Sequence, residues 1–496
     1  MAKAIGTKRR IAAVAVASVL FASIAAAQDT IVKEYEDGGI YEGTFKDGKQ
    51  HGQGTYKLPN GFIYTGDWVE GEILGNGTAQ YPNGSVYEGA FVAGKPHGKG
   101  KITFADGGSY EGDWVNGEIE GEGVARYANG VVYTGGFLKA LHHGKGKMES
   151  AAGYSYDGDW VKGIKEGNGT IRYPDGAVYE GGMLAGQRAG QGKLTLADGL
   201  VYEGGWAEGK MNGEGKLIQP NGDVYEGQFV AGKRQGKGKV TYTGGDSFEG
   251  EFVADRRHGQ GVFKGGDGYV YDGGWVEGRI EGTGKVTYPD GTVYEGQFVN
   301  DLANGTGKIA YADGSSYEGG WKGGVIEGEG TARYANGLIY EGTFRAGKSH
   351  GKGKMTYPDG YSYVGDWNNG SRDGQGVATY ADGTVYTGGF LRGQRNGQGE
   401  IVMADGFRYV GSWRSGEIDG EGTATYPNGD VYEGSFAGGK RQGQGTMRYS
   451  NGETASGLWR GGALAEPAAP AADDAASDEA APQSDASSDG SSASGN

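Results

Sequence analysis

The sequence predicts an all-β protein, folded as an elongated, twisted, single-layer antiparallel sheet of tandem β-hairpins. First, a 23-residue period begins at Tyr41 and runs through eighteen full copies, 41–454, without an insertion or deletion, followed by a partial copy at 455–462. Second, 87 of the 107 glycines occupy positions 3, 8, 12, 14 and 21 of this period, counted from the tyrosine as position 1. Third, tyrosine opens every full copy except the one that begins at Phe248. Many short strands joined by glycine turns account for such a pattern.

Each copy is predicted to form one hairpin. Positions 22 to 6, as in SVYEGAF, alternate polar residues with β-branched or aromatic ones, and this period of two is typical of a strand. Positions 14 to 18, as in GTAQY, are expected to form the second strand, with a glycine-bearing loop GxxxG at positions 8–12 between the two. The P-N-G or P-D-G at positions 19–21 predicts a type I turn with its glycine in the left-handed region. Contacts between neighbouring copies alone make the array solenoid-like.

The two faces of the sheet are expected to differ. Alternation places positions 1, 3, 5, 14, 16 and 18 on one face, where the glycines at 3 and 14 leave room for aromatic rings to lie across the backbone. On the other face, position 2 is acidic in thirteen copies and position 15 is lysine in eight, for example Glu88 and Lys101. These residues predict a solvated ladder of cross-strand pairs.

The predicted organisation has four parts: a signal peptide at 1–27, a short lead-in at 28–40, the repeat array at 41–462 and a disordered acidic tail at 463–496. The first part has Lys3, Lys8, Arg9 and Arg10 before an apolar stretch at 11–24 and three alanines, as in a cleavable export signal. We therefore expect a periplasmic or extracellular protein. The tail has seven acids, no base and no aromatic residue, so it cannot bury enough apolar surface to fold.

Composition excludes several classes of function. Removing the four positive charges of the signal takes the formal net charge from −16 to −20, which disfavours nucleic acid as a partner. The chain has no cysteine, so disulfides and thiolate chemistry are excluded. Five of the six histidines occupy position 11 of different copies, too far apart to share one metal ion. No unique acid–base pair stands out, so we expect no catalytic, cofactor or metal site.

The pattern Y-E-G-x-W/F-x-x-G-x-x-x-G-x-G-x-x-x-Y-x-x-G resembles the MORN repeat (membrane occupation and recognition nexus), over residues 41–462. The resemblance implies an elongated, twisted antiparallel sheet that acts as a scaffold, a dimerisation surface or a docking surface. It also implies contact with membrane lipid as an alternative.

Successive copies alternate in two ways. Position 5 is in turn Phe and Trp, with Met183 in one Phe place, and all nine tryptophans lie there, so the unit of duplication is 46 residues with a break of phase at the copy that begins at Phe248. Positions 9–11 are mostly basic in Phe copies, as in KQH and KPH, and acidic-leaning in Trp copies, as in EIL and EIE. This alternation is expected to fix the register between copies and is also compatible with docking onto a second, antiparallel chain.

We predict a non-enzymatic exported scaffold that binds protein partners, or a second copy of itself, through its aromatic face. A cell-envelope glycan and membrane lipid are the alternative ligands, and nucleic acid is not expected. The irregular copies 133–155 and 248–270 are candidate sites for a bend, an interface or a notch, or they reflect sequence drift. The predicted binding residues, which share positions 1 and 5 of the Trp copies, are Tyr64, Trp68, Tyr110, Trp114, Tyr156, Trp160, Tyr202, Trp206, Tyr271, Trp275, Tyr317, Trp321, Tyr363, Trp367, Tyr409 and Trp413.

Overall fold

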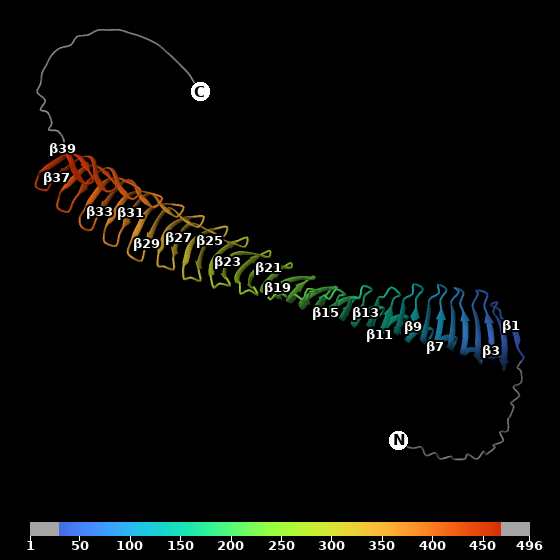
Figure 1. The fold of residues 1–496 in the computed structure, drawn as a ribbon. Helices are drawn as coiled ribbons and strands as arrows, with labels where there is room; N and C mark the ends of the chain where they lie inside the picture. The colour runs from blue at the N-terminus through green and yellow to red at the C-terminus, as the bar shows by residue number, and fades with distance from the viewer. Residues whose placement is uncertain (1–28, 468–496) are drawn as a thin grey trace, which may run out of the picture. The chain divides into compact units, whose positions relative to one another are not determined.

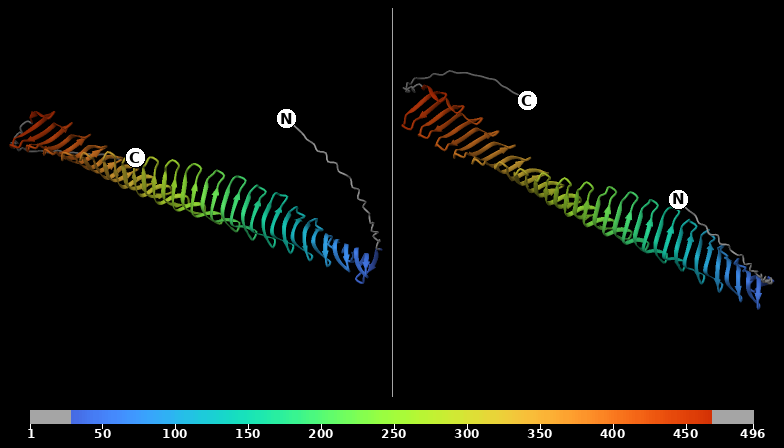
Figure 2. Two further views of the ribbon diagram at one scale, coloured as in Figure 1. Left: turned by 90° about the horizontal axis from the view of Figure 1, so that it is seen from below. Right: turned by 60° about the horizontal axis from the view of Figure 1, so that its bottom comes forward.

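The computed structural model describes residues 29–467, which form an antiparallel sheet of 39 strands, confirming the all-β prediction. These residues divide into two compact units, one of residues 29–243 and 252–255 and the other of residues 244–251 and 256–467. Within each unit the strands lie side by side in a single layer, in chain order, and their direction turns steadily from strand to strand (Figures 1 and 2). The predicted signal peptide, 1–27, and residues 468–496 of the predicted tail lie outside the described residues.

The strands follow the repeat closely. They are β1 (Ile31–Glu34), β2 (Ile40–Lys46), β3 (Lys49–Lys57), β4 (Ile63–Val69), β5 (Glu72–Gln80), β6 (Val86–Val92), β7 (Lys95–Thr103), β8 (Ser109–Val115), β9 (Glu118–Arg126), β10 (Val132–Leu138), β11 (Leu141–Glu149), β12 (Ser155–Val161), β13 (Ile164–Arg172), β14 (Val178–Leu184), β15 (Gln187–Thr195), β16 (Val201–Ala207), β17 (Lys210–Ile218), β18 (Val224–Val230), β19 (Lys233–Thr241) and β20 (Ser247–Val253). The rest are β21 (Arg256–Lys264), β22 (Val270–Val276), β23 (Arg279–Thr287), β24 (Val293–Val299), β25 (Leu302–Ala310), β26 (Ser316–Lys322), β27 (Val325–Arg333), β28 (Ile339–Arg345), β29 (Lys348–Thr356), β30 (Ser362–Asn368), β31 (Ser371–Thr379), β32 (Val385–Leu391), β33 (Gln394–Val402), β34 (Arg408–Arg414), β35 (Glu417–Thr425), β36 (Val431–Ala437), β37 (Lys440–Arg448), β38 (Thr454–Arg460) and β39 (Ala463–Pro467).

The connection within each hairpin is shorter than predicted, and the expected loop at positions 8–12 is wrong. In copy 363–385, β30 and β31 are joined by Asn369 and Gly370 alone, with φ of 49° and 85°. Two successive residues with positive φ are typical of a type I′ turn, whose twist matches that of the flanking strands. Positions 9–11 therefore belong to the second strand, which spans positions 9–17 instead of 14–18.

The glycine at position 12 has a separate role, because it lies in a bulge and not in a loop. The register between β30 and β31 shifts between Gly365 and Trp367, where Asp366 faces the three residues 373–375. Gly374, in the middle of these three, has a φ of 113°, and its equivalents in every copy also have positive φ. A bulge of this kind strengthens the local twist of the strand.

The connection between copies is the predicted turn. In the turn after β31, the N–H of Gly383 donates to Tyr380 O at 2.9 Å, and the N–H of Tyr380 donates to Thr384 O at 2.8 Å. Gly383 has a φ of 90°, and the Asp382 carboxylate accepts a 2.9 Å hydrogen bond from the N–H of Thr384. The type I turn with a left-handed glycine is therefore confirmed.

Both ends of the array carry partial copies. In the lead-in, β1 pairs with β2 and ends in a turn like those between copies. At the other end, β39 pairs with β38, with Leu464 opposite Trp459. The predicted start of the disordered tail at 463 is therefore wrong, because this leucine extends the nineteenth copy into its second strand.

Candidate binding face

The sixteen predicted binding residues lie on one face, as expected, but their side chains are buried. The tyrosines of this set are 0–2% exposed and the tryptophans 3–9%. Wherever position 5 is aromatic, the position-1 ring packs edge-on against the position-5 rings of its own copy and of the next, as Tyr363 does against Trp367 at 5.2 Å and Phe390 at 4.9 Å between ring centroids. Mutual packing thus accounts for these rings, and their contact with a partner stays a prediction.

The tyrosines lie over the paired glycines, as predicted. A Cβ atom added to Gly376, at position 14, would lie 2.5 Å from Cζ of Tyr363. The Tyr363 hydroxyl also donates a 2.9 Å hydrogen bond to the carbonyl of Asp366, the position-4 residue in the bulge. All seventeen position-1 tyrosines make this bond. The hydroxyl therefore explains why the position is tyrosine and not phenylalanine.

The tryptophans link each Trp copy to the copy before it. Nε1 of Trp367 donates a 3.1 Å hydrogen bond to the carbonyl of Gly353, at position 14 of the preceding copy. All nine tryptophans make the equivalent bond. Phenylalanine has no N–H to donate, so the link occurs once in each 46-residue module.

Charged pairs on the opposite face join copies in the same order. Lys99 at position 13 of a Phe copy lies 2.6 Å from the carboxylate of Asp113 at position 4 of the next Trp copy, and Lys352 lies equally close to Asp366. The lysine beside each carboxyl lowers the pKa of Asp113 and of Asp366 below its usual value. These pairs are consistent with the expectation that alternating charges set the register, which stays a prediction.

Side chains from both edges of the sheet meet above the ring core and cover it. Arg372 at position 10 hydrogen bonds to the hydroxyl of Tyr361 at position 22 of the preceding copy. In the first unit, the Tyr127 hydroxyl and Nε2 of His142 are 2.8 Å apart in the same kind of contact. This cover explains how a single-layer sheet keeps its aromatic residues dry.

The cover of the second unit includes an arginine row, which we define as Arg372, Arg395 and Arg441. The guanidinium carbon of Arg395 lies 4.4 Å from the ring centroid of Trp413, and that of Arg441 lies 4.5 Å from Trp459. Among residues 29–467, no carboxylate forms an ion pair with any of these three arginines. The sequence does not reveal the row, because the glycine spacing predicts a loop at positions 8–12.

The cover also includes a tyrosine row at position 18 of the second unit. Tyr288, Tyr311, Tyr334 and Tyr449 are 38–42% exposed, although burial of the remaining surface raises the pKa of Tyr311 and Tyr334. The full row is Tyr288, Tyr311, Tyr334, Tyr357, Tyr380, Tyr426 and Tyr449, with Gly265 and Met403 in the two remaining places of the second unit. The regular Y-x-x-G of the repeat could have identified it.

In several copies the position-11 residue hydrogen bonds to the turn of the next copy, and His51 and His97 do so, whereas Nδ1 of His143 and of His350 is buried without a hydrogen-bond partner. Nδ1 of His97 lies 3.4 Å from the N–H of Asn116, a position-7 residue. Glu327 makes the equivalent contact in a Trp copy, where its carboxylate accepts a 2.8 Å bond from the N–H of Ala346. Among residues 29–467, no group of three or more metal-ligating side chains is placed to hold an ion.

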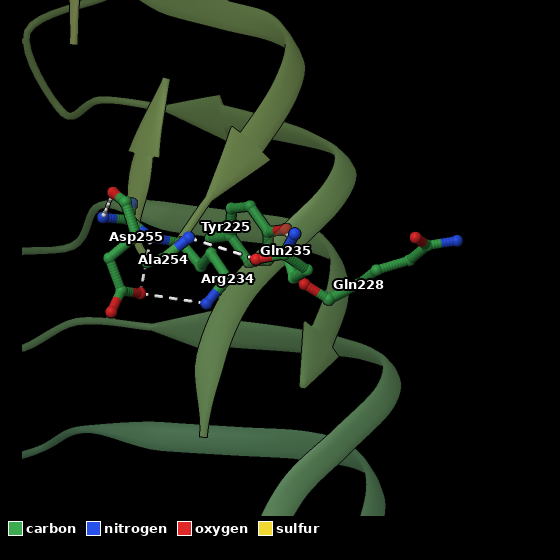
Figure 3. A network of polar contacts seen from close by, with 6 residues as sticks. All are labelled: Tyr225, Gln228, Arg234, Gln235, Ala254 and Asp255. Atoms are coloured by element: carbon green, nitrogen blue, oxygen red, sulfur yellow. Dashed lines mark hydrogen bonds and ion pairs between the residues drawn. The ribbon is translucent and has the colours of Figure 1, made fainter. Parts of the chain in front are cut away.

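The irregular copy 248–270 keeps this tie and adds further hydrogen bonds to it (Figure 3). Asp255 replaces the glycine at position 8 with a φ of 73°, and its carboxylate accepts a 2.9 Å bond from the N–H of Arg234. The Arg234 guanidinium returns a 2.8 Å bond to the carbonyl of Asp255, and Gln235 accepts a bond from the N–H of Ala254. These bonds offset the strain of a non-glycine residue in the left-handed region. All of the residues that make them belong to the first unit.

The opposite, polar face carries the predicted ladder. Lys308 faces both Glu295 and Glu318 across its two neighbouring strands, 4.0 Å from the Glu318 carboxylate. An open groove of about 1010 Å³ runs over this part of the second unit, with glycines such as Gly307 in its floor. The charges along the groove alternate in sign, so they already neutralise one another. The polar face is therefore a weaker candidate for a charged ligand than the arginine row.

Comparisons with known proteins agree with this architecture. The MORN repeat model matches residues 41–62, 64–86, 87–109, 110–132, 133–153, 156–178, 179–201, 202–224, 225–247, 248–268, 271–293, 294–316, 317–339, 340–360, 363–385, 386–408, 409–431 and 432–454. No curated protein matches the chain. Within residues 29–467, no helix has the length and apolar character needed to cross a membrane.

Solved structures give only distant likenesses. The SAS-4 (dCPAP) TCP domain of Drosophila melanogaster, in complex with a proline-rich motif of Ana2, is 16% identical over 36% of this chain and 90% of that one, with a TM-score of 0.21. The TCP10 domain of Danio rerio CPAP with a STIL peptide is 14% identical over 68% of this chain and 99% of that one, with a TM-score of 0.10. TM-scores this low carry no argument about function. The match to eighteen consecutive copies does decide the family, and the chain belongs to the MORN repeat family.

Proposed function

We propose that this chain is a non-enzymatic, exported scaffold that binds protein partners through the tyrosine and arginine rows of its second unit. The half-exposed tyrosine row is the observation that carries the proposal, since the predicted position-1 and position-5 rings are buried. Tyrosine and arginine are the residues most enriched at the energetic centres of protein interfaces. Tyrosine supplies a large, rigid, amphipathic surface at low entropic cost.

The dimensions of the row suit a partner of ordinary size. Neighbouring strands lie about 4.8 Å apart, so one copy advances the row by about 10 Å. A standard interface buries about 800 Å² on each partner, which three or four copies of the row can provide. The longest unbroken stretch of the row has five tyrosines, from Tyr288 to Tyr380.

The decisive experiment compares capture of envelope proteins by the full chain and by two variants. In the face variant, Tyr288, Tyr311, Tyr334 and Tyr357 are each replaced by serine. In the control, Lys285, Glu295, Lys308 and Glu318 of the polar face are each replaced by serine, which leaves the net charge unchanged. Equal melting curves establish that both variants fold.

We expect the face variant to lose a partner that the parent chain and the control variant both retain, and the purified partner to bind with the same dependence. Equal capture by all three chains, or loss only from the control, would refute the proposal. If the retained ligand is instead an insoluble cell-wall glycan, the tyrosines serve sugar binding. The regular step of about 10 Å is the feature that favours this second candidate.

Self-association and export have separate tests. Light scattering after size exclusion is expected to show a dimer if the partner is a second copy, and a strict monomer at high concentration would contradict it. For export, N-terminal sequencing of the chain recovered outside the cytoplasm is expected to start near Gln28. An intact Met1 on a chain confined to the cytoplasm would contradict the signal peptide.

A further inference from the structure

We propose that the chain's own tail, residues 468–496, binds along the arginine and tyrosine rows of the second unit as an extended acidic segment. The contact needs no external partner, so it stands or falls independently of the protein-binding proposal. Its first basis is the arginine row, whose three guanidiniums stack on aromatic rings without an ion-pair partner among residues 29–467. No neighbouring carboxylate therefore neutralises these three guanidiniums, in a protein with a net charge of −16.

The tail has the complementary chemistry. After Pro467 it contains no basic residue, and its six acids are Asp473, Asp474, Asp478, Glu479, Asp485 and Asp489. Pro467 and Pro470 are three residues apart, and Pro482 follows. Prolines at this spacing favour polyproline II, which has three residues per turn, and aromatic-lined surfaces are the usual docking sites for such segments.

The repeat and this conformation share one period. Polyproline II rises about 3.1 Å per residue, so three residues advance by about 9.3 Å. Two strands of the sheet, which make one copy, advance by about 9.4–9.8 Å. An extended tail that runs back across the strands therefore places every third residue over the same position of successive copies.

The place where the described chain ends fixes which residues meet. Pro467 ends β39, and Arg441, Arg395 and Arg372 belong to the first, third and fourth copies before the partial copy. These copies lie at about 10, 29 and 38 Å along the sheet. Asp473 and Asp474 lie about 19–22 Å along an extended tail, and Asp478 and Glu479 about 34–37 Å. The first pair of acids thus falls between Arg441 and Arg395, and the second pair falls near Arg372.

Tethering makes such a contact effective even if each ion pair is weak. A segment joined directly to its site has an effective concentration in the millimolar range. Because exposed charges are screened beyond about 8–10 Å at physiological ionic strength, the contact should weaken with added salt.

Distance measurement between two spin labels on the full chain tests this inference. The native chain has no cysteine, so Ala476→Cys in the tail and Ala381→Cys in an exposed turn of the second unit give two unique attachment sites. We expect one narrow distance distribution at low salt. The distance distribution should broaden when Asp473, Asp474 and Asp478 are changed to Asn and Glu479 to Gln. These four changes leave residues 29–467 unaltered, so the sheet itself is not disturbed.

The matched variants locate the site. Arg372→Gln, Arg395→Gln and Arg441→Gln together are expected to remove the narrow component, whereas Lys285→Gln, Lys308→Gln and Lys354→Gln on the polar face should retain it. A broad distribution in the parent chain, or a narrow one that survives loss of the tail acids, would overturn the proposal. Loss of the narrow component on tenfold dilution with unlabelled chain would show binding to a second copy and overturn the intramolecular contact. Capture of a protein partner through the tyrosine row does not depend on where the tail binds. Each of these results therefore refutes the tail contact without refuting the protein-binding proposal.

Discussion

The position-14 glycine offers the sharpest test of how the core is built. In copy 363–385, Gly376 lies under the ring of Tyr363, and a Cβ atom there would lie 2.5 Å from the ring Cζ. The backbone of Gly376 has no positive φ, so alanine meets no conformational barrier and only the ring opposes it. Gly370 in the same copy is the matched control, because its Cβ would meet nothing within 4 Å and its φ of 85° is the only penalty.

The two substitutions should differ in size. In Gly376→Ala the Tyr363 ring must leave its place, which forfeits burial comparable to a large-to-small core substitution of about 3–5 kcal/mol. Loss of its bond to the Asp366 carbonyl adds about 1 kcal/mol. Gly370→Ala should cost only about 1–2 kcal/mol, the penalty of an alanine in the left-handed region.

Hydrogen exchange resolved by peptide is the suitable assay, because repeat arrays open locally and a single global unfolding transition is not assured. We expect Gly376→Ala to lower protection in copy 363–385 and its neighbours by at least tenfold more than Gly370→Ala does. Equal protection in the two variants, or greater loss in Gly370→Ala, would refute the idea that the glycine is there to hold the ring.

Three further predictions concern the aromatic core. Tyr179→Phe removes the hydroxyl that caps the bulge and should lower stability by about 1 kcal/mol in denaturant melts, while Phe248→Tyr should raise it by a similar amount; opposite signs would contradict the capping role. Trp206→Phe loses the indole bond to the preceding copy and should cost about 1–2 kcal/mol, and an unchanged melting midpoint would argue against that link. Burial raises the pKa of Tyr64 to about 12, against about 10 in an unfolded chain. The folded state thus holds protons that the unfolded state loses, so stability should be constant below pH 10 and should fall between pH 10 and 12. Circular dichroism with tyrosinate absorbance checks this, and a midpoint that does not change up to pH 12 would contradict it.

The repeat pattern was sufficient to predict the hairpins, the turn at positions 19–21 and the two faces, because each depends on residues close together in the sequence. The GxxxG at 8–12 was misassigned for a physical reason. Gly370 and Gly374 both need positive φ, but one belongs to a two-residue turn and the other to a bulge inside the strand. Glycine spacing alone does not distinguish the two, since the difference lies in how the neighbouring strand pairs.

The candidate site was harder to predict than the fold. Large aromatic residues such as Tyr363 and Trp367 are the obvious candidates for a binding face. Their side chains are buried against neighbouring rings, so a partner cannot reach them. The residues that remain available, such as Arg395 and Tyr334, lie at opposite edges of the sheet. They share one face because long side chains from the two edges meet above the core, as Arg441 does with the ring of Tyr426.

The sequence by itself determined the family, the existence of one hairpin in each copy and the period, because an uninterrupted 23-residue repeat specifies the same local structure in every copy. It also determined that positions 1 and 5 would be aromatic neighbours. Only the tertiary structure decided which aromatic residues a partner can reach. Exposure depends on which side chains of adjacent copies close over the rings, and that depends on twist, curvature and the bulge at position 12, none of which a linear pattern specifies.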